Sequence, residues 1–339
     1  MRIAVSGSIA VDHLMVYPGR FAEQFLSEMV EHVSLSFLAD HLEVREGGVG
    51  ANISWGMARL GLRPVLVGAA GLDFAPYGQR LRDAGVDTAS VRVSDTLHTA
   101  RFVCTTDTDQ NQIATFYAGA MAEAGGIDLA EVHLRTGGLD LVLVGADDPA
   151  AMLRHTAAAH TLGVPVAADP SQQLARLDGE QTRRLVEGAR LLFTNEYESA
   201  LLLERTGWSE EEVLRRVGTW IVTRGARGVC MLAAGGLRTD VPAVPAGDVV
   251  DPTGVGDAFR AGFLAGLAWR LPHERAAQLG CALATLVLGT VGTQEYKLLP
   301  SELLARIADT YGPSAAREIG AHLEGATAGS GAGSEVRGR

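Results

Sequence analysis

The sequence predicts an α/β fold with a mostly parallel central sheet and a small second sheet. From residue 139 onward, short apolar runs alternate with helical patterns, and such repetition is typical of parallel strands joined by crossover helices. Residues 98–117 instead alternate between apolar and polar side chains, are rich in Thr, Phe and Val, and are interrupted by the polar residues 107–111. This second pattern predicts a β-hairpin that lies outside the main sheet.

The first half of the chain begins with a buried strand over residues 3–6, where an apolar run ends at a glycine. A helix is expected over 47–61, because its apolar side chains recur on one helical face. Residues 65–67 are a short apolar run and predict the next strand. Residues 76–84 follow with a helical pattern that closes at Gly85.

The second half repeats one unit, in which a short Val- and Leu-rich run predicts a strand and the next segment carries apolar positions at helical spacing. Strands are expected at 141–144, 164–168, 191–194, 221–223 and 229–232. Helices are expected at 149–162, 179–187, 196–206, 209–217, 255–270, 274–288 and 301–311.

The chain has no internal repeat and no long linker, so a single domain over residues 1–320 is expected. Segments of a lid formed by the small sheet are expected near 11–20, 31–46 and 98–118. The remaining residues, 321–339, are rich in Gly, Ala and Ser. Such a composition buries little apolar surface and predicts a disordered tail.

Composition excludes several classes of protein. The formal net charge is −11 and no run of Lys and Arg occurs, which argues against a nucleic-acid partner. The three cysteines are isolated and odd in number, a pattern that fits free thiols in a reducing compartment. The apolar run at the N-terminus is too short for a signal peptide, and no stretch reaches the roughly 20 apolar residues that cross a bilayer. We therefore expect a cytoplasmic protein without a membrane partner.

The most informative stretch is residues 251–262, where a polar loop runs directly into an apolar helical segment. Gly254 and Gly256 allow another group to approach the backbone closely. The first N–H groups of a helix have no partner within it and, with the helix dipole, attract an anion. Asp257 stands among them, and we expect its carboxylate to be kept ionised and able to accept a proton. The combination suits transfer of a phosphoryl group to a hydroxyl.

A second glycine-rich segment, GGVGAN at residues 47–52, opens the first helix. It would let a ligand approach the backbone, with Asn52 supplying a hydrogen bond, although a glycine-rich turn before an ordinary helix explains it equally well. Asp12 follows the first strand, at the end where ligands of open parallel sheets bind. It could hold two hydroxyl groups of a sugar, and a surface turn is the alternative.

Three further patterns have both a functional and a structural explanation. Asn195 and Glu198 would lie near phosphates and magnesium, or they cap the helix that follows. The segment TRGARG at residues 223–228 would wrap a nucleotide, or it is a tight glycine turn. Phe102 and Phe116 would stack on a flat base, or they hold the small sheet together. The chain has neither a P-loop nor a Gly-x-Gly-x-x-Gly motif after its first strand, which disfavours P-loop kinases and standard dinucleotide dehydrogenases.

The segments at 47–52 and 251–257 (DPTGVGD) resemble the two signatures of the ribokinase (PfkB) carbohydrate kinase family. The Asn195–Glu198 and 223–228 patterns fall between them in the expected order. The resemblance covers about residues 1–315. It implies a three-layer α/β/α body with a β-sheet lid over the substrate.

Closer still, the chain resembles actinobacterial adenosine kinases, in segments 7–13, 33–37, 98–102, 169–176 and 257–263. The resemblance implies a clamp for the ribose hydroxyls, formed by Asp12, Gly48 and Asn52. It implies contacts to base and ribose from Ser8, Ser36, Gln172 and Gln173, with Arg176 in the same motif. It also implies that Phe102 and Phe116 flank the purine.

The same resemblance assigns the phosphoryl-transfer residues. Asp257 matches the catalytic base, and the N–H groups of Gly254, Val255, Gly256 and Asp257 match the anion hole. Thr223, Gly225, Gly228 and Asn195 would contact ATP, and Glu198 would organise Mg²⁺ through water. Asp251 and Thr253 are candidates for a K⁺ site, since family members often bind a monovalent cation close to this loop.

The function expected is therefore ATP-dependent phosphorylation of the 5′-hydroxyl of adenosine to give AMP. One alternative is a kinase of the same fold for another nucleoside or for a sugar such as ribose or fructose. A non-catalytic nucleoside-binding protein is the alternative from another class. An exposed lid sheet could pair with a second copy, so a homodimer through the lid is also expected.

Overall fold

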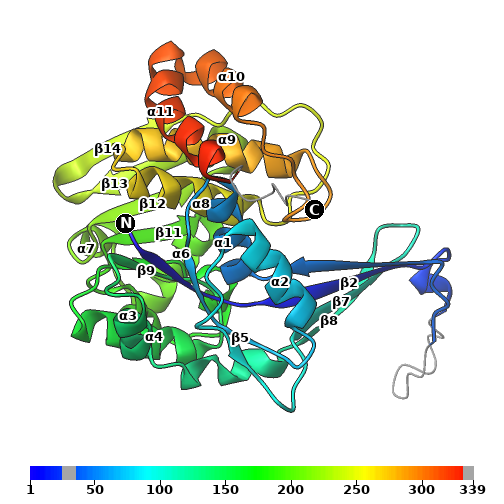
Figure 1. Cartoon of the computed structure of the whole chain (residues 1–339). Coiled ribbons are helices and arrows are strands. Elements are labelled where there is room, and N and C mark those ends of the chain that lie inside the picture. The colour runs from blue at the N-terminus through cyan, green and yellow to red at the C-terminus, as the bar shows by residue number, and fades with distance from the viewer. Residues whose placement is uncertain (25–35, 331–339) are drawn as a thin grey trace, which may run out of the picture.

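The computed structural model describes residues 1–24 and 36–330, and its centre is an eight-stranded sheet (Figure 1). The strand order is β14-β13-β12-β11-β10-β9-β1-β4. Neighbouring strands from β4 to β12 are parallel, and β13 and β14 extend one edge with antiparallel pairs. The strands are β1 (Ile3–Ser6), β4 (Val65–Val67), β9 (Leu141–Val144), β10 (Val166–Ala168), β11 (Leu191–Asn195), β12 (Thr219–Thr223), β13 (Val229–Ala233) and β14 (Leu237–Val241).

Helices cover both faces of this sheet, because its strands carry apolar side chains on both sides. In β1, for example, Ile3 and Val5 belong to one core cluster and Ala4 to the other. The first face packs against α1 (Val49–Arg59), α8 (Val255–Ala268), α9 (His273–Leu288), α10 (Pro300–Tyr311) and α11 (Pro313–Ser330). The second packs against α3 (Leu129–Arg135), α4 (Pro149–Thr161), α5 (Gly179–Val186), α6 (Glu196–Thr206) and α7 (Glu210–Leu214). The three-layer α/β/α prediction is confirmed.

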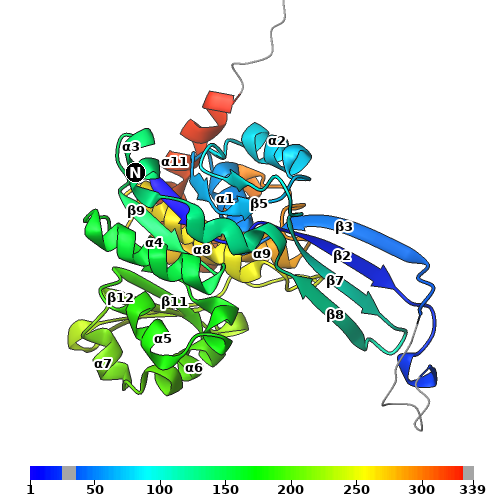
Figure 2. The same cartoon turned by 90° about the horizontal axis from the view of Figure 1, so that it is seen from below.

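A four-stranded sheet extends from one side of the body, as Figure 2 shows, and we call it the lid sheet. Its order is β3-β2-β7-β8, from β3 (His41–Gly47), β2 (Ala10–Val16), β7 (Ala100–Thr106) and β8 (Gln112–Tyr117). Between body and lid sheet lie α2 (Ala75–Ala84), which packs on α1, and a two-stranded sheet of β5 (Ala69–Ala70) and β6 (Arg92–Val93).

The tip of the lid sheet has a small core of its own. The rings of Tyr17 and Phe21 stack at 5.6 Å between centroids, and Phe37 packs against both of them. The side chain of Asp107, in the β7–β8 turn, accepts a hydrogen bond of 2.9 Å from the amide of Phe21. The predicted lid segments are therefore joined at this end, although residues 31–35 of the segment 31–46 lie outside the described residues.

The structure confirms the hairpin predicted for residues 98–117, with β7 and β8 as its arms. Other predictions need correction. Strands β2, β3 and β14 and helix α3 were not predicted as such. The tail was expected to be disordered from residue 321, but α11 continues to Ser330, and the part from 331 onward lies outside the described residues. None of the described helices combines the length and apolarity that crossing a bilayer requires.

Candidate active site

The N-terminus of α8 lies where the two glycines predicted it. Gly254 caps the helix with φ +73°, in the left-handed region. A Cβ atom at this position would lie 2.6 Å from Cγ2 of Thr293, so only glycine fits. Helix geometry leaves the first N–H groups, those of Gly254, Val255 and Gly256, without intrahelical acceptors. This end of α8 therefore offers an anion site with a partial positive charge.

Asp257 lies in the first turn of α8, is half-buried, and accepts a hydrogen bond of 2.8 Å from Nδ2 of Asn52. Burial raises its pKa to about 7, which outweighs the hydrogen bond from Asn52 and the charge of Arg260. The nearby carboxylates of Asp169 and Glu198 raise it further. The expectation of a fully ionised carboxylate is therefore corrected, because desolvation dominates. A pKa near 7 suits a general base at neutral pH.

Arg260 follows one turn later on α8 and was not predicted as part of the site. Its guanidinium forms two buried hydrogen bonds with Asp169, Nε to Oδ2 at 2.8 Å and Nη2 to Oδ1 at 2.7 Å. Nη1 also donates to the carbonyl of Gly256 at 3.3 Å. This pair fixes the start of α8 against the loop after β10. A charged residue inside an otherwise apolar helical run was the sequence signal that could have found it.

One row across the lid sheet contains three predicted site residues, Asp12, Phe102 and Phe116, and the neighbouring Arg45. Arg45 on β3 is opposite Asp12 on β2, Asp12 is opposite Phe102 on β7, and Phe102 is opposite Phe116 on β8. Residues directly opposite one another point to the same face of a sheet. The structure therefore brings Asp12, Phe102 and Phe116 together, although they come from distant parts of the sequence. Burial raises the pKa of Asp12 to about 6, and the charge of Arg45 partly opposes that rise.

Ser8 and Gly48 form the start of α1, the helix that carries Asn52. Gly48 has φ +96°, and a Cβ atom there would lie 2.5 Å from the carbonyl oxygen of Ser8. Oγ of Ser8 accepts a hydrogen bond of 3.1 Å from the amide of Val49. In this structure both residues thus shape the entry to the helix, and the close backbone approach predicted for the glycines is to the chain itself.

The amide of Asn52 is engaged at both ends. Its nitrogen donates to Asp257, and its oxygen accepts from Oγ1 of Thr293 and Nε2 of Gln294, each at 2.9 Å. The residue predicted to clamp ribose hydroxyls therefore lies directly beside the predicted base. Thr293 and Gln294 were missed, because more than 200 residues separate them from Asn52 in the sequence.

The remaining predicted substrate residues have different surroundings. Gln173 lies in the short helical turn after β10, is buried, and its Oε1 has no hydrogen-bond partner among the described residues. Gln172 and Arg176 flank it and are exposed. Ser36 is exposed beside the undescribed segment, and the next residue, Phe37, packs at the tip of the lid sheet.

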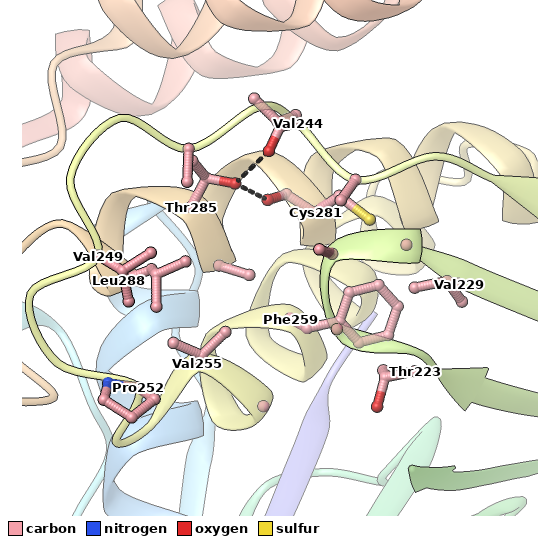
Figure 3. Close-up of a pocket in the computed structure, with 17 residues that line it drawn as sticks. Thr223, Val229, Val244, Val249, Pro252, Val255, Phe259, Cys281, Thr285 and Leu288 are labelled. Atoms are coloured by element: carbon pink, nitrogen blue, oxygen red, sulfur yellow. Dashed lines mark hydrogen bonds between the residues drawn. The ribbon is translucent and has the colours of Figure 1, made fainter. Parts of the chain in front are cut away.

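A cavity of about 510 Å³ adjoins the anion site on the side of the body (Figure 3). The predicted residues Thr223, Gly225 and Gly228 line it, and so do Val255 and Gly256 at the start of α8. The other walls are mostly apolar and come from α8, from the loop after β14 and from one face of α9: Phe259, Val244, Val249, Cys281, Ala284, Thr285 and Leu288 among them. An apolar cavity beside an anion site suits the flat base of a nucleotide whose phosphates reach α8.

Asn195 and Glu198 form a capping box at the start of α6. The amide of Asn195 donates to Oε2 of Glu198 at 2.7 Å, and the amide of Glu198 donates to Oδ1 of Asn195 at 2.8 Å. The capping alternative is therefore observed. Burial raises the pKa of Glu198. Because Mg²⁺ in phosphate sites is usually held by one or two carboxylates, waters and phosphate oxygens, this single carboxylate fits a water-mediated contact.

Asp251, a predicted K⁺ ligand, already has hydrogen-bond donors and a cation around its carboxylate. Its Oδ1 accepts from the amide of Thr253 at 2.9 Å, and its Oδ2 accepts from the amide of Gly292 at 3.0 Å. Nη1 of Arg45 lies 3.8 Å from the same Oδ2. A potassium ion here would stand beside a guanidinium, so these residues as arranged do not fit it. In the described part of the chain, no cluster of three or more His, Cys, Asp or Glu forms a metal cage.

Comparisons with known proteins agree with this geometry. The nucleoside kinase of Burkholderia thailandensis in its ligand-free form is 36% identical, with a TM-score of 0.81 over 90% of this chain and 99% of that one. Its structure in complex with ADP-inosine is 35% identical, with a TM-score of 0.76 over 91% and 96% of the two chains. The nucleoside kinase of Methanothermobacter thermautotrophicus is 33% identical over 73% of this chain and 80% of that protein.

The family itself follows from a match to a family model. A family model described as pfkB family carbohydrate kinase matches residues 7–300, which include both glycine-rich segments and the first turn of α8. We conclude that the chain belongs to the pfkB family of carbohydrate kinases.

Proposed function

We propose that the protein is an ATP-dependent nucleoside kinase that converts adenosine and ATP to AMP and ADP. One observation carries the proposal: Asp257, whose pKa is near 7, lies between an apolar cavity with an anion site and the row of lid residues that contains Asp12. The similarity to enzymes named nucleoside kinases, one of them in complex with ADP-inosine, supports a nucleoside as acceptor.

In the proposed reaction Asp257 takes the proton from the ribose 5′-hydroxyl, and the oxygen attacks the γ-phosphorus of ATP in line with the departing ADP. The N–H groups at the start of α8 hold the oxygens of the transferred phosphoryl group where negative charge accumulates. The proton leaves Asp257 to solvent once AMP departs. Positioning supplies most of the rate, so the chain needs no covalent chemistry of its own.

The nucleotide donor occupies the apolar cavity, with its base between the β12–β13 turn and α9 and its phosphates at α8. When bound, Mg²⁺ neutralises charge on the phosphate oxygens. Glu198 would hold it through water, after its carboxylate has been fixed by the amide of Asn195.

The acceptor occupies the side of the lid sheet that carries Asp12, Phe102 and Phe116. Asp12 would accept from the ribose hydroxyls, and the two rings would flank the base, because aromatic faces stack on purines. Buried Gln173, with its free Oε1, would bind a polar edge of the base. Closure of the lid would exclude water and so protect ATP from hydrolysis.

The test is an ADP-release assay with adenosine, inosine, guanosine, cytidine, ribose and fructose, for the wild type and for Asp257→Asn. We expect adenosine to have the highest kcat/KM, and Asp257→Asn to lower kcat by about 100-fold or more, the usual scale for loss of a general base. Asp309→Asn on α10, an exposed carboxylate far from the site, serves as control.

The outcomes separate the alternatives. A preference for inosine or cytidine would overturn adenosine as the substrate but keep a nucleoside kinase. Turnover of ribose or fructose alone would point to a sugar kinase. No ADP release with any acceptor would favour a non-catalytic nucleoside-binding protein. Normal turnover by Asp257→Asn would remove the assignment of the base.

A further inference from the structure

A chain of side-chain hydrogen bonds begins at the carbonyl of Gly47, the first residue of the glycine-rich segment 47–52. The hydroxyl of Tyr77 lies 3.0 Å from this carbonyl, and Nε2 of Gln294 lies 2.6 Å from the same hydroxyl. A carbonyl oxygen can only accept, so Tyr77 donates its proton to Gly47. The oxygen of Tyr77 must then accept from Gln294, which requires the amide nitrogen of Gln294 to face it.

The same nitrogen of Gln294 continues the chain to Asn52. It lies 2.9 Å from Oδ1 of Asn52, where Oγ1 of Thr293 also donates at 2.9 Å. With two donors on one side, the carbonyl end of the Asn52 amide faces the loop at residues 293–294. The nitrogen end therefore faces Asp257, to which it donates at 2.8 Å. Each link is fixed by the one before it, starting from a backbone group whose role cannot change.

The orientation of the Gln294 amide leaves its oxygen unpaired within the described part of the chain, and the alternative orientation would disturb Tyr77 and Asn52. Its Oε1 is buried and has no partner among the described residues, and an unpaired buried acceptor is unfavourable. After the amide is turned over, this oxygen could accept from Tyr77 only if Tyr77 gave up its bond to Gly47. Turning the amide over would also favour the opposite orientation of Asn52, with a carbonyl oxygen against the carboxylate of Asp257. Two acceptors would then face each other unless Asp257 carried a proton.

We infer that Tyr77, Thr293 and Gln294 are positioning residues that set the orientation of the Asn52 amide, so that an N–H group always faces the carboxylate of Asp257. In the described structure, Tyr77 and Gln294 form no hydrogen bond with the anion site or with the row of lid residues, whereas Thr293 also packs against Gly254. Their effect on phosphoryl transfer passes through Asn52 and rests on the proposed role of Asp257 as the base.

The sharpest test is Tyr77→Phe, which removes one hydroxyl and keeps the ring. We expect kcat to fall about ten-fold, the scale of one weakened hydrogen bond to a charged group, with the Kd of ATP unchanged by calorimetry. Tyr296→Phe is a matched control: Tyr296 is also buried, and its hydroxyl has no partner among the described residues. Its kcat should stay at the wild-type value. Equal kcat values for the two variants would overturn the inference.

A second pair of variants covers the case in which Tyr77→Phe fails to fold. Thr293→Val keeps the shape of the side chain and removes the donor to Asn52, whereas Thr293→Ser keeps the donor. We expect Thr293→Val to lower kcat and Thr293→Ser to restore it. Equal loss in both variants would show that packing against Gly254, not the hydrogen bond, is what matters, and would also overturn the inference.

The failure of this inference is distinguishable from failure of the proposed function. If Asp257→Asn turns over normally, the proposed base is wrong, whatever Tyr77→Phe does. If Asp257→Asn is impaired and Tyr77→Phe is silent, only the positioning role is wrong. If the proposed base and the positioning role are both correct, the double variant Tyr77→Phe/Asp257→Asn should have the same kcat as Asp257→Asn alone. The two changes act through the same carboxylate, so their effects do not add.

Discussion

At the scale of the residue, the fold has shifted the ionisation of several carboxyl groups, two of them in the candidate site. Asp257, Asp12 and Asp147 all have pKa values above the ordinary value for aspartate, and burial is the largest cause in each case. The raised pKa of Asp257 suits its proposed role, since a base with a pKa near the working pH transfers protons well in both directions. The charge of Arg45 on the neighbouring strand lowers the pKa of Asp12 and so opposes part of this rise.

The first prediction at this scale concerns the pH dependence of turnover. Only the ionised form of Asp257 accepts a proton, and its pKa is about 7. We therefore expect kcat/KM for the nucleoside, at saturating ATP and Mg²⁺, to be constant above pH 7 and to fall about ten-fold per pH unit below it. Below about pH 6, where Asp12 also takes up a proton, the fall should be steeper. A flat profile between about pH 5 and 7 would contradict the role of Asp257 as base.

The second prediction concerns stability. Asp147, after β9, is buried, its Oδ2 has no partner among the described residues, and burial raises its pKa to about 8. Because the folded-state pKa lies above the unfolded value, the group favours folding below pH 4 or so and loses that contribution as pH rises through about 8. We expect the wild-type Tm to fall between about pH 5 and 9, and Asp147→Asn to fall less.

Scanning calorimetry at several pH values measures this difference. Asp95→Asn, at an exposed carboxylate, is the control and should follow the wild type. If Asp147→Asn loses as much Tm as the wild type over the same range, Asp147 is not protonated in the folded protein.

Some site residues could be predicted from the sequence and others could not. Asp257 and Gly254 were predicted because their signal is local: a glycine-containing loop that becomes an apolar helix. Tyr77 and Gln294 have no such signal, since their roles arise only when segments more than 200 residues apart in the sequence meet. For Asn195 and Glu198 the pattern of a helix cap and the pattern of a phosphate site are the same, so sequence alone left both open.

At the scale of the element, the lid sheet aligns the residues proposed to bind the acceptor. The register between β2 and β7 places Asp12 beside Phe102, and the hairpin places Phe116 beside Phe102. A shift of one residue would turn each side chain to the opposite face. The hydrogen bond from Phe21 to Asp107 and the aromatic cluster at the tip hold these strands in register far from the site.

Phe102→Ala is the prediction at this scale. Stacking of a base on an aromatic ring contributes about 1–3 kcal/mol, so KM for adenosine should rise about ten-fold or more while KM for ATP stays constant. Any activity toward ribose should be unaffected, because a free sugar has no base to stack. Phe74→Leu, in the core beside α2, is a control for loss of an aromatic ring. An unchanged KM for adenosine would place the base elsewhere.

Elements were predicted unevenly for a physical reason. Strands β9, β10 and β11 are buried on both faces and show as uninterrupted apolar runs. Strands β2 and β3 are half exposed and carry charged side chains such as Asp12 and Arg45. Their stability comes from pairing with each other and with β7, which a local pattern does not display.

At the scale of the whole molecule, the lid sheet leaves one apolar face uncovered. Leu42 and Val44 on β3 and Ile113 and Tyr117 on β8 are exposed, and the register puts all four on the face opposite Asp12 and Phe102. Exposed apolar sheet surface favours association with another copy. We propose, as expected from the sequence, that the protein forms a homodimer through the lid sheet.

Sedimentation velocity measures this directly. We expect the wild type to sediment as a dimer and the double variant Leu42→Ser/Val44→Ser as a monomer. Leu134→Ser on α3 removes an even more exposed leucine on the body and should leave the dimer intact. A monomeric wild type, or a double variant that still dimerises, would rule out this interface.

The arrangement of the two substrate regions has an evolutionary consequence. The cavity proposed for the donor is built from the body, and the residues proposed to bind the acceptor come largely from the lid sheet, with the first turn of α8 between them. Substitutions in the lid can therefore alter which hydroxyl compound is accepted without disturbing the donor half. A duplicated gene could drift toward a new acceptor by a few changes in two or three strands, while the ancestral phosphate chemistry is inherited intact.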